Sequence, residues 1–369
     1  MPRALVIELA PDDASAGDAL RGAAARRLGL PLEDVGDVRV RRRGIDARHG
    51  VRLRYDLTVY VAGEPVPDEP RLEPPRLAPV PAGRTPVVIV GAGPAGLFAA
   101  LRLAERGIPA VVIERGKPVQ ARRRDLAAIN KQGVVDPESN YCFGEGGAGT
   151  YSDGKLYTRA GKRGPVEEVL RTLVAHGAPA SVLIDNRPHI GSNRLPGVVM
   201  RLRHTIEGAG IPVRFGSRLA AIEVDRGRVA GVRLATGEEI GCAAVVLAAG
   251  HSARDVLAIV ARAGVRLEPK PFAAGVRVEH PQPLIDAAQY GRHAGHPMLP
   301  AASYRFATTV DGRGVFSFCM CPGGWIVPSA TEQDAVVVNG MSLSRRDSPF
   351  ANSGVVVAIE PADLERLGY

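Results

Sequence analysis

A glycine-rich turn between two apolar segments constrains the fold of this chain more than any other feature. Gly91, Gly93 and Gly96 follow the β-branched run Val87–Val90, and a segment of helical composition comes next. A second apolar run, at residues 110–114, ends on an acidic residue. A strand, a glycine turn, a helix and a second strand in this order predict a parallel α/β sheet of the Rossmann type.

Each part of the turn has a physical task in binding a dinucleotide. Gly91 permits the tight turn, Gly93 lets a pyrophosphate approach the backbone, and Gly96 lets the helix pack closely on the strand. The N-terminus of the helix offers free N–H groups to the phosphates. Glu114 can accept hydrogen bonds from ribose hydroxyls, and its charge would repel the 2′-phosphate of NADP. The turn alone leaves FAD and NAD open, and the alternative is a glycine turn without a ligand.

The composition changes twice along the chain and indicates separate domains. Residues 1–63 predict a small α+β unit, because residues 51–61 alternate between apolar and polar types and residues 16–28 have helical composition. Residues 64–86 contain eight prolines and predict a stiff, extended linker. The α/β pattern begins after that linker, so we place a domain boundary there.

The net charge of +8 raises the question of an acidic partner such as a nucleic acid. Lys and Arg together number 47, but only five are lysines, and most of the arginines are scattered. This pattern indicates a bias toward arginine more than a surface built for nucleic acid. One local patch could meet RNA or an acidic protein, and its alternative is a solvated strand face: Arg39, Arg41, Arg42, Arg43, Arg48, Arg52 and Arg54.

Several absences narrow the setting of the protein. No run of 18 apolar residues occurs, which excludes a transmembrane helix from the sequence, and the N-terminus lacks the pattern of a signal peptide. Four cysteines in 369 residues do not make a disulfide framework, and no second cysteine or histidine pair suggests a metal site. We therefore predict a cytoplasmic protein that makes no membrane contact and holds no metal.

A set of motifs beyond Glu114 carries a resemblance to a known family. The main one is Asn-Tyr-Cys-Phe-Gly-Glu-Gly-Gly-Ala-Gly-Thr-Tyr-Ser-Asp-Gly-Lys-Leu at residues 140–156. Further motifs occupy residues 187–191, 247–255, 270–280, 294–297, 316–324 and 339–342. Together they resemble a large, poorly characterised bacterial family of FAD-dependent dehydrogenases, which has the architecture of flavoproteins with two dinucleotide-binding domains.

The resemblance implies FAD as the cofactor, with hydride or electrons passing between FAD and an unidentified organic substrate. It implies a Rossmann-like FAD-binding domain at residues 87–160 and 196–262. An α+β substrate domain would be inserted at residues 161–195 and 263–369. The residues that it places at FAD are Gly91, Gly93, Pro94, Ala95, Gly96, Glu114, Arg115, Gly146, Gly147, Ala148, Gly149, Ala249, Gly250 and His251.

The sequence departs from the family in its C-terminal part. The family usually has a further glycine-rich motif with an acidic residue beside the flavin, and residues 251–369 contain none. We therefore expect a truncated substrate domain with an unpaired sheet edge and weaker binding of FAD. The alternative to truncation is a short form that closes the flavin site in another way. The alternatives are a truncated FAD-binding or apo scaffold without catalysis, and a flavin-dependent RNA-modifying protein that uses the basic patch. NAD(P)H could serve as a transient reductant, although no second complete glycine motif is visible.

Three residues are candidates for the chemistry itself. The spacing of Cys319 and Cys321 can bring both thiols to one side of a strand, where they could exchange electrons with a flavin as a dithiol. The alternative is two small cysteines that pack a buried strand. Lys155 lies in the loop that the resemblance places beside the flavin and could hold a water or donate a proton. Its alternative is a salt bridge within the loop, with Asp153 as the neighbouring acid.

Overall fold

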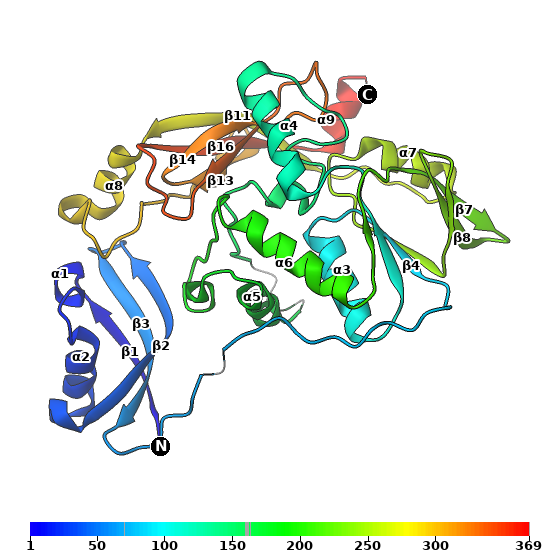
Figure 1. The fold of residues 1–369 in the computed structure, drawn as a ribbon. Coiled ribbons are helices and arrows are strands. Elements are labelled where there is room, and N and C mark those ends of the chain that lie inside the picture. Colours follow the sequence, from blue (N-terminus) through cyan, green and yellow to red (C-terminus); the bar gives the residue numbers. More distant parts are fainter. Residues whose placement is uncertain (70, 159–161, 163, 369) are drawn as a thin grey trace.

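The computed structural model describes residues 1–69, 71–158, 162 and 164–368. Three regions built on separate sheets follow one another along the chain (Figure 1). They are an N-terminal α+β unit, a central α/β unit and a C-terminal antiparallel sheet. The predicted α/β class with an additional small N-terminal domain is therefore confirmed.

The N-terminal unit is a three-stranded antiparallel sheet covered by one helix. Its strands are β1 (Arg3–Leu9), β2 (Val35–Asp46) and β3 (Arg52–Val61), in the order β1-β3-β2. The helices are the short α1 (Pro11–Ala14) and α2 (Ala19–Leu28). Alternate residues of β3 are buried against α2, as the apolar alternation predicts. The helix α2 ends at Gly29, whose φ of 67° is the left-handed conformation that glycine adopts most easily.

The proline-rich linker is anchored to the central unit and is not a free spacer. Its described residues between 64 and 86 form no helix or strand. Val80 donates a backbone hydrogen bond of 2.9 Å to the carbonyl oxygen of Ala209. Leu77 and Val80 also pack against the apolar core of the central unit. The linker therefore follows the surface of the α/β unit.

The central unit is a parallel sheet whose two faces are covered by different layers. The strands β4 (Val87–Val90), β5 (Ala110–Ile113), β6 (Val213–Arg214) and β10 (Ala244–Leu247) lie in the order β10-β4-β5-β6. One face packs on α3 (Pro94–Glu105) and α6 (Leu195–Gly208). The other face packs on α7 (Arg254–Arg262) and on a second, antiparallel sheet. That sheet consists of β7 (Leu219–Asp225), β8 (Arg228–Leu234) and β9 (Glu239–Gly241).

Residues 161–195, which the sequence assigns to the substrate domain, lie partly outside the described residues. The described part contains α5 (Val166–Ala175) and a 3₁₀ turn, Ala180–Leu183. Val182 and Ile190 are buried against Leu195 and Val198 of α6. The segment therefore extends the core of the central unit, because its apolar residues are buried on the helix that follows it in the chain.

The C-terminal region is built on a four-stranded antiparallel sheet. Its strands are β11 (Phe272–Pro281), β12 (Ala307–Val310), β13 (Arg313–Cys321) and β16 (Phe350–Ile359), in the order β11-β16-β13-β12. A hairpin of β14 (Gly324–Pro328) and β15 (Val338–Ser342) packs beside it. The helices of this region are α8 (Gln282–Tyr290) and α9 (Pro361–Arg366). Large apolar side chains such as Val276 and Phe318 remain exposed on this sheet.

The N-terminal unit contacts both other regions. Val51 packs with Tyr290 at the end of α8, and Arg43 pairs with Asp185 of the central unit. The helix α4 (Val119–Gln132) lies above the central sheet and contacts the hairpin of the C-terminal region (Figure 1). Among the helices of the described residues, none is both long and apolar enough to cross a membrane.

Candidate active site

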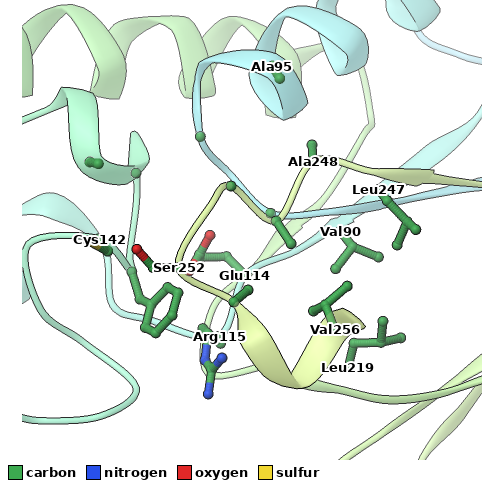
Figure 2. A pocket seen from close by; sticks show the side chains of 18 of the residues that line it. Val90, Ala95, Glu114, Arg115, Cys142, Leu219, Leu247, Ala248, Ser252 and Val256 are labelled. Carbon is green, nitrogen blue, oxygen red and sulfur yellow. The ribbon is translucent and has the colours of Figure 1, made fainter. Parts of the chain in front are cut away.

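A cavity of about 420 Å³ lies at the carboxyl ends of the parallel strands β4, β5 and β10 (Figure 2). In open α/β sheets this edge is where ligands bind, and the volume is in the range of small-molecule sites. Its walls are the glycine turn, the residues after β5, the 147–149 loop, the start of β7 and the residues after β10. Figure 2 shows Glu114 and Arg115 beside the loop that carries Ser252, with Ala95 at the start of the helix above them.

Most of the residues predicted at FAD line this cavity. They are Gly91, Gly93, Pro94, Ala95, Glu114, Arg115, Gly147, Ala148, Gly149, Ala249, Gly250 and His251. Gly96 and Gly146 lie behind the wall and have packing tasks. A Cβ atom on Gly96 would collide with the carbonyl oxygen of Gly91, and one on Gly146 would collide with Thr150. These two glycines therefore shape the wall from behind.

The sequence did not predict several other lining residues. They are Val90, Ile113, Cys142, Phe143, Ser217, Ser252, Ala253, Asp255 and Val256. Most of them flank a predicted strand end or glycine, so the rule that ligands sit at strand carboxyl ends could have found them. Phe143 and Cys142 lie in the motif at residues 140–156, where the resemblance places only Gly146, Gly147, Ala148 and Gly149 at FAD.

Three backbone segments meet around the glycine turn and form a cradle. Gly91 has a φ of 106°, and a Cβ atom there would collide with the carbonyl oxygen of Ala248. A Cβ atom on Gly147 would lie 3.3 Å from the Cα atom of Gly93. Among the described side chains, none caps the N-terminus of α3, so the first N–H groups of that helix stay available. The arrangement fits the phosphates of a dinucleotide.

Glu114 holds the walls of the cavity together through its carboxylate. The side chain is 5% exposed. Its Oε2 atom accepts a hydrogen bond of 2.8 Å from the N–H of Ala92, and Oε1 accepts bonds of 2.9 Å from the N–H groups of Gly116 and Gly144. A carboxylate has about four acceptor positions, so one position on Oε2 remains for a ribose hydroxyl. The predicted role at the ribose is compatible with this geometry, and a structural role accompanies it.

Arg115 is held at the rim of the cavity by charges and by an aromatic ring. Its guanidinium lies 4.3 Å from the ring centre of Phe143. It pairs with Glu138 at 2.8 Å and with Asp255 at 3.1 Å. Burial opposes the charge of Arg115, but the two carboxylates outweigh burial and raise its pKa. Because both acids already bind this guanidinium, its main task is to fix the rim of the cavity. His251 is an exposed residue of the same rim.

The three predicted catalytic residues come together at a second place. The Nζ atom of Lys155 lies 3.3 Å from the Sγ atom of Cys321 and 3.8 Å from that of Cys319. In the described structure none of the three lines the cavity. The chain runs from Gly149, which lines the cavity, to Lys155, and such a short segment spans at most about 20 Å. We use the name thiol cluster for Lys155, Cys319 and Cys321, the charged residues that contact them, and the arginine that binds Asp153 beside them.

Asp153 anchors the thiol cluster through a buried carboxylate. The side chain is 1% exposed and lies 2.9 Å from Lys155 Nζ and 2.6 Å from Arg346 Nη2. Ser342 donates a further hydrogen bond to it. Burial alone would raise the pKa of the Asp153 carboxyl, but Lys155 and Arg346 lower it to about 2. The salt bridge that the sequence offered as the alternative role of Lys155 is therefore present, together with the contacts to both thiols.

The backbone bends at Cys319, where β13 and β16 shift in register. Cys319 has a φ of 47°, a left-handed conformation that is uncommon for residues other than glycine. Two guanidinium nitrogens of Arg277 donate to its carbonyl oxygen, at 2.8 and 3.3 Å. The register shift falls between Phe318 and Cys321. Arg277 and Arg346 were not predicted in this cluster, because each is far along the chain from the residue it contacts.

The cluster changes the acidity of its thiols in opposite directions. A hydrogen bond from Cys321, reinforced by the charges of Lys155 and Arg277, lowers the pKa of the Cys319 thiol in spite of its burial. The same hydrogen bond and burial raise the pKa of the Cys321 thiol. Burial opposes the charge on Lys155, but Cys321, Asp153 and Cys319 outweigh it and raise the pKa of the ammonium. The pair therefore favours one thiolate, on Cys319, beside one thiol.

The basic patch of the N-terminal unit is largely neutralised by acids. Arg39 pairs with Asp37 at 2.8 Å, and Arg41 pairs with Glu69 at 2.7 Å. The remaining contacts are Arg43 with Asp185, Arg48 with Asp46, Arg54 with Asp56, and Arg42 with the side-chain oxygen of Asn186. Arginines that bind carboxylates of their own chain have less charge to offer to phosphates, so these contacts do not favour the RNA alternative.

An open parallel sheet with a glycine cradle at its carboxyl edge defines a dinucleotide-binding α/β protein. Family models identify the dinucleotide. The FAD binding domain matches residues 84–134, and the model described as FAD-dependent protein, C-terminal domain-like, matches residues 271–367. A domain of unknown function, DUF8436, matches residues 1–62. The chain is therefore an FAD-binding protein that carries the C-terminal domain of FAD-dependent proteins, and the prediction of FAD as cofactor is confirmed.

One relative matches almost the whole chain. An uncharacterised protein of Clostridium beijerinckii is 39% identical over 355 residues. The match covers 92% of this chain and 66% of that protein, so the chain spans slightly less than two thirds of the length of this relative.

Solved structures share part of the arrangement. They include FqzB (TM-score 0.37, 14% identity), CtdE in complex with FAD (0.34, 14%) and THI4 of Thermovibrio ammonificans (0.34, 20%). They cover 79%, 75% and 49% of this chain, and 56%, 60% and 64% of their own chains, respectively. The likeness to each of them is partial.

Proposed function

We propose that the chain is part of an FAD-dependent oxidoreductase that passes hydride or electrons between FAD and a small organic substrate. The observation that carries the proposal is the glycine cradle, in which a Cβ atom at Gly91 would collide with Ala248 and the Gly147 loop closes on Gly93. A cradle of this kind lets a pyrophosphate approach the backbone. When bound, FAD supplies two-electron chemistry that side chains cannot perform by themselves.

The residues of the chain would bind and orient the cofactor in four ways. The free N–H groups at the start of α3 would hold the pyrophosphate. The remaining acceptor position of Glu114 would bind a ribose hydroxyl. The Gly147–Gly149 turn would lie along the cofactor, because its small residues leave room for it. Arg115, fixed by Glu138 and Asp255, would keep the rim in place. NAD(P)H as a transient reductant belongs to the same proposal.

The substitution Gly93→Ala tests the cradle with little effect on the fold. Gly93 has a φ of −73°, which any residue adopts, and a Cβ atom there would meet nothing closer than Gly147 Cα at 3.9 Å. The variant should therefore fold normally, while the new methyl group occupies the path of the pyrophosphate. Gly208→Ala, in the same unit and with nothing within 4 Å of the new Cβ atom, is the matched control.

The measurement is the absorbance of bound flavin together with the rise in melting temperature on adding FAD. We expect bound flavin and stabilisation in the wild type and in Gly208→Ala, and a loss of both in Gly93→Ala. Reduction of the bound flavin by NAD(P)H or by an organic substrate would support the enzyme. A colourless wild-type protein that FAD does not stabilise would contradict the proposal and favour an apo scaffold.

A further inference from the structure

We propose that Cys319 and Cys321 form a redox-active dithiol that reduces disulfide substrates, with Cys319 as the attacking thiolate and Lys155 as the residue that stabilises it. The observation behind this inference is that both sulfurs contact one ammonium group, at 3.8 and 3.3 Å. It concerns the side chains of the thiol cluster alone. It therefore stands independently of the flavin reaction proposed above.

The bend at Cys319 turns the two sulfurs toward the same point. In a regular strand, residues two positions apart have Cα atoms about 6.7 Å apart, which is near the upper limit for a disulfide. Here the left-handed conformation of Cys319 and the register shift interrupt the strand between the two cysteines. The carbonyl oxygen of Cys319 also accepts a contact of 3.4 Å from the Cys321 thiol. Strained backbone conformations of this kind are found preferentially at functional sites.

The surroundings of the two thiols differ from those of cysteines that only fill space. Cysteines that merely pack a strand lie among apolar side chains. In the described structure, the thiol cluster instead contains the cations Lys155, Arg277 and Arg346 and the single carboxylate of Asp153. This excess of positive charge favours a thiolate, because thiolates form beside lysine and arginine. All four cysteines of the described chain are free.

Exposure separates the roles of the two cysteines. Cys319 is half-buried, whereas Cys321 is completely buried. Of the two residues, only Cys319 is therefore partly open to solvent and to a substrate. Cys319 would carry the attacking thiolate, and Cys321 would stay protonated until an intermediate forms beside it.

The reaction proceeds in two exchange steps. The Cys319 thiolate attacks one sulfur of the substrate, so that a mixed disulfide forms and the first substrate thiolate leaves. Cys321 then gives up its proton and attacks Cys319 Sγ, which breaks the mixed disulfide and releases the second substrate thiolate. Overall, the two cysteines lose two electrons and become a disulfide, and the substrate disulfide gains them and becomes two thiols. The proton of Cys321 and one from solvent complete the two product thiols.

The test uses the full chain with the other two cysteines removed. Cys142→Ser and Cys242→Ala remove the two thiols outside the cluster, so that neither can react with the probe. Serine suits the half-buried position 142, and alanine suits the buried position 242. The probe is dithiobis(nitrobenzoic acid), which releases the coloured thionitrobenzoate. We expect two thionitrobenzoate molecules per chain and a protein mass lower by two hydrogens, without an adduct. A protein that keeps one or two adducts and forms no internal disulfide would overturn the proposal.

Single substitutions then assign the roles of the two cysteines. Cys321→Ser should release one thionitrobenzoate rapidly and retain the adduct on Cys319. Cys319→Gly, which suits the left-handed backbone, should make the remaining thiol react at least tenfold more slowly. Near-ultraviolet circular dichroism checks that each variant is folded. Equal rates for the two variants would contradict the assignment of Cys319 as the attacking residue.

The role of Lys155 is tested by a pH profile, which a purely structural role would not change. In the wild type, the alkylation rate by iodoacetamide should stay high as the pH falls below the ordinary thiol pKa of about 8.5. Lys155→Met should move the midpoint of this profile upward by about one unit, which is about tenfold in rate on the acid side. Lys155→Arg should restore most of the wild-type profile. An unchanged midpoint in Lys155→Met would show that the ammonium does not stabilise the thiolate.

Discussion

The cavity at the carboxyl ends of the parallel strands and the thiol cluster are built from different kinds of groups. The cavity is formed largely by backbone and small residues at the ends of neighbouring strands. The thiol cluster is formed by long side chains, and Lys155 and Cys321 are 166 positions apart in the chain. Charges have opposite uses in the two places. In the cavity wall, Glu114 accepts backbone N–H groups and Arg115 binds carboxylates of the same wall. In the thiol cluster, Lys155 contacts the sulfur of Cys319, and Arg277 donates to the carbonyl oxygen of that residue.

This difference indicates how each place responds to substitution. A cavity made of backbone should be sensitive to an added methyl group, and its response should depend little on pH or salt. A cluster made of charges should be sensitive to the loss of one charge, and its response should change with pH and salt.

Removing the central carboxylate of the thiol cluster should have the largest effect on stability. Asp153→Ala removes a buried carboxylate and leaves the largely buried charge of Arg346, together with the partly exposed ammonium of Lys155, without their shared acid. Breaking a buried pair in this way costs about 3–5 kcal/mol of the free energy of unfolding. The control is Glu167→Ala, which breaks an exposed pair with Arg171 and should cost about 0.5 kcal/mol or less. Urea unfolding measures the free energy of unfolding of both variants. Similar losses would show that the ion pairs of Asp153 stabilise the fold no more than an exposed pair does.

The cavity could be predicted well from the sequence because its signals are local. The strand Val87–Val90, the three glycines and Glu114 fall within 28 consecutive residues, and each has a fixed task in a strand–turn–helix unit. The alternation in β3 likewise identified the core face of the N-terminal sheet. The sequence pattern does not reveal that Glu114 also holds two loops of the cavity wall together. Its bond to the N–H of Gly144 joins two loops that are 30 positions apart.

For the thiol cluster, the sequence predicts individual residues but not the contacts that bring them together. The sequence indicates Cys319, Cys321 and Lys155 as separate chemical candidates. The spacing of two cysteines within one strand does not reveal which lysine will lie beside them. The contacts of Asp153 with Arg346 and of Arg277 with Cys319 depend on how the C-terminal sheet meets the 153–155 loop. The placement of residues 164–195 on α6 depends on the same packing between regions. Tertiary contacts of this kind leave no periodic signal in the sequence.

In the cavity, an added methyl group at Gly91 should destabilise the fold itself. Gly91 has a φ of 106°, and a Cβ atom there would collide with the Ala248 carbonyl oxygen. Strain and overpacking together should lower the free energy of unfolding by about 3 kcal/mol. Gly93→Ala, in the same turn, should leave stability within about 0.5 kcal/mol, since its new methyl group would make only an ordinary contact with Gly147 Cα at 3.9 Å. Thermal unfolding without FAD compares the two, and equal losses would contradict the description of Gly93 as a ligand-facing position.

The thiol cluster should make stability depend on acid pH, because the pKa of Asp153 is lowered to about 2 in the folded chain. An aspartate in the unfolded chain has a pKa of about 3.9. The stabilisation is therefore present above about pH 4 and is lost as the pH falls toward 2, by about 2 kcal/mol in total. Asp153→Asn should lack this part of the acid profile. Urea unfolding between pH 5 and 2 measures it, and parallel profiles for wild type and variant would contradict the pairing.

The smallest expected effect is a preference of the thiol cluster for negatively charged disulfides. Three cations against one carboxylate leave a positive field at Cys319 among the described side chains. Dithiobis(nitrobenzoic acid), which is anionic, should therefore react several-fold faster than the cationic disulfide cystamine, after each rate is divided by that of free cysteine. Lys155→Met should reduce this ratio about two- to threefold, and high salt should reduce it in the wild type. The matched control is Lys131→Met, on the exposed end of α4 and outside the cluster, which should leave the ratio unchanged. A ratio that responds equally to both lysines would mean that the overall charge of the protein, and not the thiol cluster, selects the disulfide.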